Sequence, residues 1–239
     1  NWARIIAQSV YYFYCYFLAE DDNQPINFSV PTGNFGDVYA GYLAKKLGLP
    51  INKLIVATNQ NDILHRAISK GKYEAEHVSE TISPSMDIQI ASNFERLIYD
   101  LNNHDSSQTL DDMKNIKQNG KYTIDDEKLK KINQDFLSAR MSEQETLDVI
   151  KNIYEKFNMV LDPHTAIGYG AFDKHDLKGN NIVLATAHPC KFPDAILKAI
   201  NLKSDLPDEL KFILDEEENY GIIENSFKEI KQYILGKIK

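Results

Sequence analysis

A β-prone run followed by a glycine loop is the first feature of this sequence that could do chemistry. The run covers residues 26–30, Pro31 ends it, and the loop Thr32-Gly33-Asn34-Phe35-Gly36 follows, with Asp37 placed to cap a helix over residues 38–47. Backbone N–H groups and a helix dipole converge where such a loop meets a helix, and both attract a phosphate group. The loop has neither the Walker pattern nor the dinucleotide-binding glycine spacing, so it would hold a different phosphate. By pattern alone, a tight turn that binds nothing explains the loop equally well.

Two further segments carry hydroxyl and imidazole groups that could contact a ligand. The apolar run over residues 182–187 predicts a buried strand, and it places Thr186 and His188 near the carboxyl end of that strand, where open parallel sheets bind ligands. The segment Asp162-Pro163-His164-Thr165 has the pattern of a helix start. For each of these side chains taken alone a structural role is favoured, because strand-end hydroxyls and single histidines are usually satisfied within the fold.

Metal ligation and nucleophilic catalysis are not favoured. The six histidines show no helical pairing with a carboxylate, and Cys15 and Cys190 lie far apart without a Cys-x-x-Cys pattern. Ser85 and Cys190 lack a nucleophile elbow or a positioned base. We therefore expect no metal site and a reducing, cytoplasmic setting.

The composition limits the class of partner. The 239 residues are 43% hydrophobic and 26% charged, which is typical of a globular chain with a sizeable core. The formal net charge of −8, with no concentrated basic patch, argues against nucleic acid and anionic membranes. The longest apolar run, residues 10–19, is well short of the roughly 20 residues that a membrane-spanning helix needs.

The glycine loop is expected to lie within a strand, helix, strand unit. Strands over residues 26–30 and 54–58, joined by the helix over 38–47, predict two parallel strands in a sheet covered on both faces. A helix over residues 2–18 has apolar residues nearly all round, which predicts burial on several sides. The chain turns at residues 21–25 between that helix and the first strand.

The later part of the chain is expected to leave the sheet and return to it. Asn61 caps a short helix to Ser69, and another helix runs from about residue 89 to 101. Residues 102–119 are polar, and residues 125–157 are helical and charged, with a capping box of Ser142 and Glu145. The chain is again helical from Pro193 onward.

Six blocks of sequence, in order along the chain, closely resemble the threonine synthase family of the longer bacterial and fungal type. They are Asn1-Trp2-Ala3-Arg4-Ile5, Pro31-Thr32-Gly33-Asn34-Phe35-Gly36-Asp37, Ile55-Val56-Ala57-Thr58-Asn59, Asn61-Asp62-Ile63-Leu64-His65-Arg66, Ser83-Pro84-Ser85-Met86-Asp87-Ile88 and Ala185-Thr186-Ala187-His188-Pro189. The resemblance runs from Asn1 to about Leu202 and is weakest over residues 102–157. It implies an α/β fold, the tryptophan synthase β-like fold type II of pyridoxal-phosphate enzymes, with an incomplete parallel sheet flanked by helices in this chain.

The resemblance also implies a division of the chain and a cofactor, pyridoxal 5'-phosphate. Residues 1–101 would be part of the cofactor-binding α/β domain and residues 102–160 a helical excursion. Residues 161–239 would return to that domain and end in helices, with the amino-terminal part of the enzyme outside this chain.

Site residues follow by position in the matched blocks. The loop Gly33-Asn34-Phe35-Gly36-Asp37 would cradle the cofactor's phosphate, and the Thr186 hydroxyl would face the pyridine nitrogen as a neutral partner. Asn1 and Arg4 match an Asn-x-x-Arg motif that holds the substrate's phosphate, for which a planar guanidinium is well suited.

The implied reaction converts O-phospho-L-homoserine and water into L-threonine and phosphate. The family's lysine that forms an imine with the cofactor has no counterpart here, since Lys45, Lys46, Lys174 and Lys191 lie in unrelated contexts. We therefore expect no catalytic residue in this chain, and we interpret it as an inactive carboxyl-terminal portion of the enzyme.

Two alternatives remain open. A serine or threonine dehydratase of the same fold usually has a run of glycines in the phosphate loop, whereas Asn34 and Phe35 interrupt it here. A non-catalytic relative that binds a phosphorylated metabolite is the other. The oligomeric state is not predicted.

Overall fold

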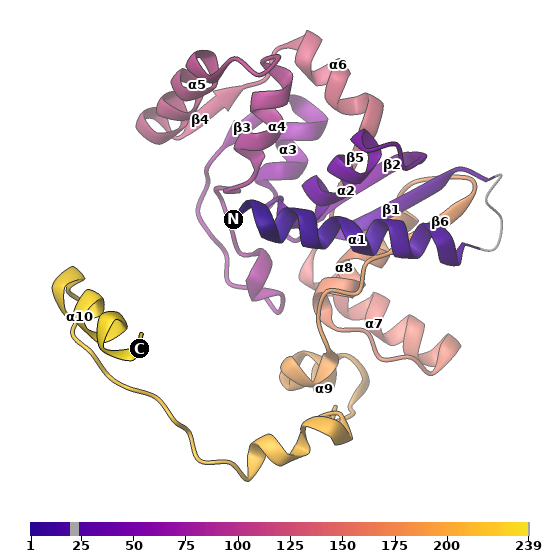
Figure 1. Cartoon of the computed structure of the whole chain (residues 1–239). Helices are drawn as coiled ribbons and strands as arrows, with labels where there is room; N and C mark the ends of the chain where they lie inside the picture. Colours follow the sequence, from indigo (N-terminus) through magenta and orange to yellow (C-terminus); the bar gives the residue numbers. More distant parts are fainter. Residues whose placement is uncertain (20–23, 239) are drawn as a thin grey trace. The chain divides into compact units, whose positions relative to one another are not determined.

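Four parallel strands form the sheet that carries the glycine loop at the end of one strand (Figure 1). They are β1 (Ile26–Pro31), β2 (Ile51–Thr58), β5 (Phe136–Arg140) and β6 (Asn180–Val183), in the spatial order β5-β2-β1-β6. The computed structural model describes residues 1–19 and 24–238, and its contacts form two compact units, Asn1–Ser204 and Asp205–Lys239. The sheet belongs to the first unit.

The predicted strand, helix, strand unit is confirmed. β1 pairs in parallel with β2, with Phe28 opposite Leu54 and Val30 opposite Val56, and α2 (Gly36–Lys46) is the crossover between them. The carboxyl end of β1 leads directly into the glycine loop, so the loop lies at the edge of the sheet where parallel strands bind ligands.

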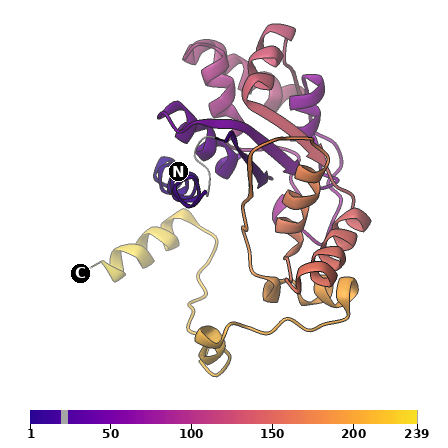
Figure 2. The ribbon, with the colours of Figure 1, turned by 90° about the vertical axis from the view of Figure 1, so that its right-hand side faces the viewer.

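Helices cover both faces of this sheet, as expected for central parallel strands. Along β2, Leu54 and Val56 face the larger core cluster, while Ile55 and Ala57 face α8 (Pro163–Asp173). Figure 2 shows α1 on one side of the strands and α8 on the other. The two-residue alternation of a strand explains why neighbouring apolar residues serve two separate cores.

The larger cluster packs several helices on one face of the sheet. Besides α2 it includes α3 (Ile63–Lys70), α4 (Phe94–Leu101) and α6 (Asp126–Asp135). A small antiparallel pair, β3 (Lys72–Glu74) and β4 (Lys121–Thr123), flanks α5 (Ser106–Asn119). On the other face α7 (Glu143–Phe157) and α9 (Pro193–Ile200) pack with α8 through Ile150, Ala166 and Ile196.

α1 spans Trp2–Leu18, the predicted bounds, but it is not buried on several sides. Only Ile5, Ser9 and Tyr12 are buried, and the large apolar side chains that remain exposed are Trp2, Ile6, Val10, Tyr11, Tyr14, Phe17 and Leu18. The described chain therefore contacts one stripe of a helix whose composition suits burial all round.

Residues 102–160 contain a strand that the amino-acid pattern did not predict. The expectation that residues 125–157 are helical is confirmed for α6 and α7 but is wrong for residues 136–140, which form β5 and pair with β2. A five-residue segment between two charged helices carries little periodicity, and the free edge of β2 decides its conformation. The capping box of Ser142 and Glu145 is present at the start of α7. The division at residues 101 and 160 stays a prediction.

Several element boundaries differ from those expected. The capping residue of α2 is Phe35, not Asp37, and the capping position of α3 is Asp62 rather than Asn61, in both cases without a side-chain cap. The helix expected from residue 89 begins at Phe94. The strand expected over 182–187 is β6, which ends at Val183 because its pairing with β1 ends there. Most of the predicted turn at 21–25 lies outside the described residues.

The second unit, Asp205–Lys239, bears out the expected helical tail only in part, because residues 215–226 form no helix. It contains η3 (Asp208–Leu214) and α10 (Phe227–Lys237), and none of its described residues is buried. Within the part of the chain that the structure describes, no helix is both long and apolar enough to cross a bilayer.

Candidate functional site

A cavity of about 640 Å³ lies beyond the carboxyl ends of β1 and β6. Its walls come from separate parts of the sequence: one side of α1, the glycine loop, the turn η1 (Pro84–Met86), the first turn of α8 and the segment that follows β6. Topology thus brings together both ends of the first unit at the ligand-binding edge of the sheet.

Five predicted site residues share this cavity. Arg4, Gly33, Asn34, Asp37 and Thr186 all line it. The other three predicted site residues, Asn1, Phe35 and Gly36, do not line the cavity. The Asn1 side chain caps α1 by accepting a hydrogen bond from the Ala3 N–H at 3.0 Å, and Phe35 and Gly36 are buried behind the loop.

The glycine loop is built so that its backbone is open to a ligand. Asn34 Oδ1 accepts from the Gly36 N–H at 2.8 Å, and the Asn34 carbonyl accepts from the Asn93 N–H at 3.0 Å. Within the described chain, the N–H groups of Gly33, Asn34 and Phe35 have no acceptor. Three unpaired donors next to the amino end of α2 are an arrangement of the kind that can bind an anion.

Gly33 cannot carry a side chain. A Cβ atom there would lie 2.8 Å from the Ser85 carbonyl oxygen and 3.1 Å from Met86 Cα. The η1 turn therefore approaches the loop backbone directly. The sequence shows the glycine but not the close contact that requires it.

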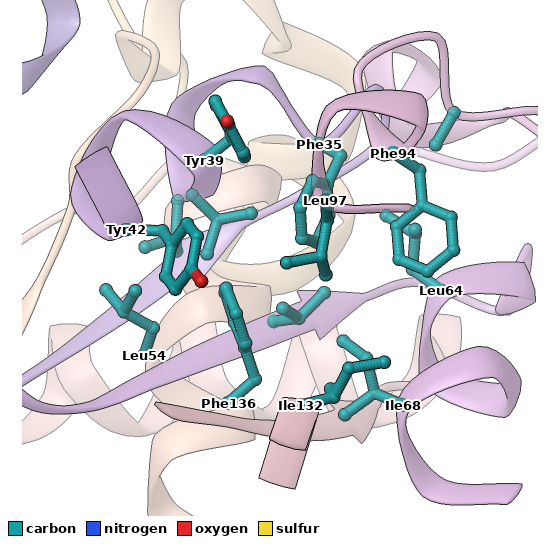
Figure 3. Close-up of a cluster of buried hydrophobic side chains, with 14 of the residues drawn as sticks. Phe35, Tyr39, Tyr42, Leu54, Leu64, Ile68, Phe94, Leu97, Ile132 and Phe136 are labelled. Atoms are coloured by element: carbon teal, nitrogen blue, oxygen red, sulfur yellow. The ribbon is translucent and has the colours of Figure 1, made fainter. Parts of the chain in front are cut away.

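Phe35 anchors the loop in the core (Figure 3). Its ring packs edge-on against Phe94 with centroids 5.2 Å apart and lies 5.8 Å from Phe136. Burying a phenylalanine contributes about 1.5–3 kcal/mol, and this offsets the cost of the left-handed backbone at Phe35, where φ is 66°. The residue thus supports the loop from behind.

A buried polar network holds the η1 turn at the end of β2. Asn59 Nδ2 donates to Asp87 Oδ1 at 2.7 Å and to Ser83 Oγ at 2.9 Å, and Asn61 Nδ2 donates to the same Asp87 oxygen at 2.8 Å. Thr81 adds a hydroxyl donor to that oxygen at 2.7 Å. The network fixes the turn that contacts Gly33.

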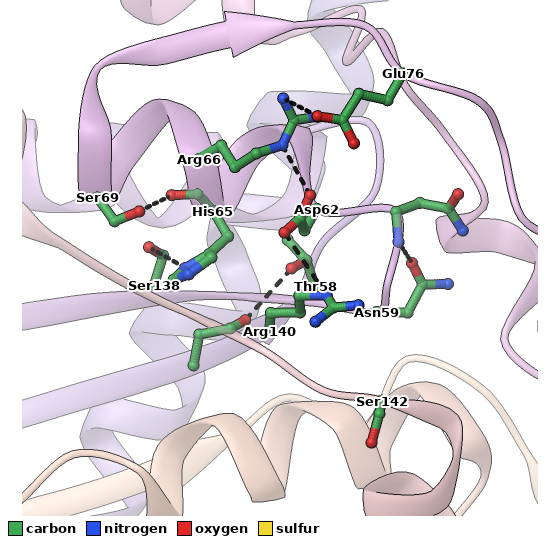
Figure 4. A network of polar contacts seen from close by, with 12 residues as sticks. Thr58, Asn59, Asp62, His65, Arg66, Ser69, Glu76, Ser138, Arg140 and Ser142 are labelled. Atoms are coloured by element: carbon green, nitrogen blue, oxygen red, sulfur yellow. Dashed lines mark hydrogen bonds and ion pairs between the residues drawn. The ribbon is translucent and has the colours of Figure 1, made fainter.

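A second network joins β2, α3 and β5 but does not line the cavity (Figure 4). Arg66 pairs with Asp62 at 2.8 Å and with Glu76 at 3.0 Å, and Arg140 lies 3.6 Å from Asp62. His65 Nδ1 lies 3.0 Å from Ser138 Oγ. These contacts support a structural role for His65 and Arg66.

Asp37 combines a carboxylate with a desolvated position at the start of α2. Burial raises the pKa of Asp37 to about 6, and the hydrogen bond from Tyr12 offsets only part of this effect. Burial and the neighbouring Asp37 raise the Tyr12 pKa well above its usual range, so Tyr12 remains a neutral donor. The cavity's acidic group therefore titrates close to neutral pH.

Two cations line the cavity without a partner. In the described part of the chain, neither the Arg4 guanidinium nor the Lys191 ammonium forms an ion pair or a hydrogen bond. By contrast, Arg66 and Arg140 are paired, and Arg96 stacks on Trp2 at 5.0 Å. An unpaired arginine beside unpaired backbone donors is suited to an anionic ligand.

Thr186 lies three residues beyond the end of β6, with an exposed side chain that has no hydrogen-bond partner in the described chain. His188, the other candidate of that segment, does not line the cavity, and its Nδ1 accepts from the Cys190 N–H at 3.2 Å. The hydroxyl, rather than the imidazole, is thus available to a ligand.

A larger cavity of about 930 Å³ lies between α1, α2, α4 and α5, away from the predicted residues. One of the acids that line it, Asp100, already accepts from Tyr39 and contacts His104, each at 3.1 Å. Because these polar groups satisfy one another, the smaller cavity is the better candidate site.

Sequence reasoning missed part of the cavity wall. Gln8, Tyr11 and Cys15 follow Arg4 at helical spacing along α1 and line the cavity with it. The spacing was readable in the sequence, but the apolar composition of the helix obscured it. Lys191 lies in the wall although its sequence context gave no indication. Among the described residues, no group of three or more His, Cys, Asp or Glu side chains is arranged to hold a metal ion.

Comparisons of this chain with known proteins give results that agree with one another. A family model described as "Threonine synthase, C-terminal" matches residues 165–234. The threonine synthase of Pseudomonas aeruginosa is 40% identical over 237 residues, which cover 98% of this chain and 50% of that protein. That of Saccharomyces cerevisiae is 43% identical over 258 residues, covering 96% of this chain and 50% of the yeast protein.

A solved structure extends the match to three dimensions. The PLP-bound threonine synthase from Brucella melitensis superposes with a TM-score of 0.92 at 42% identity, covering 98% of this chain and 51% of that one. The fold is therefore that of the fold type II pyridoxal-phosphate enzymes, as the motifs implied, and the chain spans about half the length of these relatives. The chain belongs to the threonine synthase family and corresponds to its carboxyl-terminal portion.

Proposed function

We propose that this chain supplies part of the site of a threonine synthase, the pyridoxal-phosphate lyase that converts O-phospho-L-homoserine and water into L-threonine and phosphate. The observation that carries the proposal is that an unpaired Arg4 shares one cavity with the unpaired backbone donors of the glycine loop. Two phosphate groups, one on the cofactor and one on the substrate, require two such binding elements.

The residues present fit pyridoxal 5'-phosphate. The N–H groups of Gly33, Asn34 and Phe35 would hold its phosphate beside the start of α2, and the close approach of Ser85 to Gly33 shapes the cradle. The free Thr186 hydroxyl would meet the ring nitrogen. When bound, the cofactor supplies the electron sink that allows protons to leave carbon atoms of the substrate.

The chain's own groups would orient the substrate and control its charge. Arg4 would bind the substrate's phosphate, with Asn1 fixing the first turn of the helix that carries it. The protonation of Asp37, at the loop's end, would respond to the charge of the bound phosphate, because the pKa of Asp37, about 6, lies near neutral pH. Thr186, being neutral, would leave the ring nitrogen without a fixed negative partner.

The dehydratase alternative is disfavoured by the loop itself. Asn34 closes the loop onto Gly36 and Phe35 is built into the core, so neither position behaves as an interchangeable glycine. A non-catalytic phosphate-binding relative is the second candidate, and a complete protein without an imine-forming lysine would favour it.

Phosphate and threonine release from O-phospho-L-homoserine tests the proposal. The complete natural protein that carries this chain is assayed with pyridoxal phosphate beside the 239-residue chain itself. Release by the complete protein alone is the expected result, and release by neither would contradict it. Release by the short chain would move the imine-forming role to one of its own lysines, with Lys191→Ala as the deciding variant.

We place this activity in the cytoplasm, with small molecules as its ligands and without nucleic acid or membrane partners. The two cysteines are unpaired thiols, which suits a reducing compartment.

A further inference from the structure

One buried nitrogen in the cavity wall has no partner. His164 is only 4% exposed and lines the cavity, and its Nε2 atom has no hydrogen-bond partner in the described chain. An unpaired polar atom in a buried position costs about 1–3 kcal/mol, so such an atom at a cavity wall is available to a group bound in the cavity.

The ring is held in one orientation by Asp162. Asp162 Oδ1 lies 3.1 Å from His164 Nδ1 and accepts from the His164 N–H at 2.9 Å, while Oδ2 accepts from the Thr165 hydroxyl. Burial acts to raise the pKa of Asp162, but the hydrogen bonds from His164 and Thr165 outweigh it and hold the pKa below its usual value. An ionised carboxylate requires a proton on Nδ1, so Nε2 is the atom left for a ligand.

The same contacts remove the helix end itself as an anion site. Asp162 occupies the capping position of α8 and accepts from the first free N–H groups, those of His164 and Thr165. The carboxylate also neutralises the helix dipole there. What α8 offers the cavity is therefore the imidazole ring and not its backbone.

The charge around the ring favours an anionic ligand. The other groups that line the cavity include the cations Arg4 and Lys191 and the carboxyl of Asp37, while the Phe192 ring packs on the imidazole at 4.9 Å. Neither cation is neutralised by the described chain. A protonated ring would add an Nε2–H donor to these two cations, and Asp162 would balance its charge from behind.

We propose that His164 binds the phosphate group of the substrate, and of the phosphate product, through its Nε2–H, with Asp162 as the positioning residue. The proposal rests on the proposed function, because the glycine loop is assigned to the other phosphate, that of the cofactor. Binding of the phosphate dianion then includes uptake of a proton by His164. Arg4 and Lys191 already carry a positive charge, so neither of them would take up a proton when phosphate binds.

Calorimetric titration with inorganic phosphate tests this without relying on turnover. Phosphate is titrated at about pH 8, where it is chiefly the dianion, into the complete natural protein loaded with cofactor. Repeating the titration in buffers of different ionisation enthalpy counts the protons taken up. We expect proton uptake by the parent, and for His164→Gln about tenfold weaker phosphate binding without that uptake.

Two controls match this variant. His175 is a half-buried histidine with an unpaired Nε2 that does not line the cavity, so His175→Gln is expected to leave phosphate affinity and proton uptake unchanged. Asp37→Asn removes the cavity carboxyl, whose pKa burial raises to about 6, and proton uptake that persists in this variant is assigned to His164.

The outcomes separate the possibilities. Unchanged phosphate affinity in His164→Gln overturns the proposal. The absence of proton uptake when the parent binds phosphate also overturns it, and this measurement does not depend on the variant folding. A loss confined to pyridoxal phosphate binding by the cofactor-free protein would assign His164 to the cofactor's phosphate and overturn the substrate assignment. A protein that binds phosphate in the expected way but releases no threonine would support His164 and contradict the proposed function.

Discussion

Tyr12 joins two walls of the cavity, because its hydroxyl donates to the Asp37 carbonyl at 2.8 Å and lies 3.2 Å from the Asp37 carboxylate. Tyr12 belongs to α1, which carries Arg4, and Asp37 lies in the first turn of α2, which follows the glycine loop. The ring also packs on Phe28 of β1 with centroids 4.8 Å apart. The two proposed phosphate-binding elements are thus held at a fixed separation by one buried side chain.

Removal of the Arg4 guanidinium tests the proposed substrate contact. Arg4→Ala in the complete protein is expected to raise KM for O-phospho-L-homoserine about 10- to 100-fold, since a hydrogen bond to a charged group contributes about 1.5–3 kcal/mol. Cofactor absorbance stays unchanged, because Arg4 is not assigned to the cofactor. Arg96→Ala, which removes an arginine stacked on Trp2 outside this cavity, is the control. Unchanged kinetics in Arg4→Ala would remove Arg4 from the site.

A carboxylate in place of the Thr186 hydroxyl tests the ring contact. Thr186→Asp is expected to shift the absorbance of the bound cofactor and to increase side reactions, because a negative partner holds the pyridine nitrogen protonated. Thr186→Ser retains the hydroxyl and serves as the control, with the parent's spectrum expected. An Asp variant with the parent's spectrum would show that this position does not face the ring.

The raised pKa of Asp37 predicts a pH-dependent cost to stability. The folded protein binds a proton at this site up to about pH 6, whereas the unfolded chain releases it near its usual value, so Asp37 lowers stability as pH rises between the two. Asp37→Asn is therefore expected to raise the free energy of unfolding by up to about 3 kcal/mol near neutral pH and to have little effect below about pH 4. Melting temperatures of parent and variant across this range check it, and a variant advantage that grows toward acid pH would contradict the assignment.

The contact between α1 and α2 depends on a glycine. A Cβ atom on Gly41 would lie 2.4 Å from Tyr12 Cε1, so Gly41→Ala is expected to destabilise the protein by about 1–3 kcal/mol although alanine favours a helix. A Cβ atom on Gly236 of α10 would meet no other atom within 4 Å, and Gly236→Ala is the matched control. Equal melting temperatures for the two variants would mean that α1 moves away from Gly41 without cost.

Local sequence signals predicted the framework of the sheet. The strand, helix, strand unit around Pro31 and the bounds of α1 follow from apolar periodicity and from turn residues, which act over a few neighbouring positions. The glycine loop and Thr186 were found through motif spacing. These features need no knowledge of what lies across the fold.

β5 and the boundaries of β6 required long-range information. Residues 136–140 form a strand because β2 offers an unpaired edge, and β6 ends at Val183 because its partner strand β1 turns into the loop. Neither cause is encoded in the segment concerned, since strand formation depends on the neighbouring strand.

The sequence by itself determined the family, the phosphate-type loop and the residue types of the site. Only the tertiary structure decided that Arg4 and Lys191 are unpaired, that His164 presents a buried nitrogen without a partner, and that Asp37 is desolvated. The physical reason is that pairing and desolvation depend on every group packed around an atom, and in this chain those groups come from segments far apart in sequence.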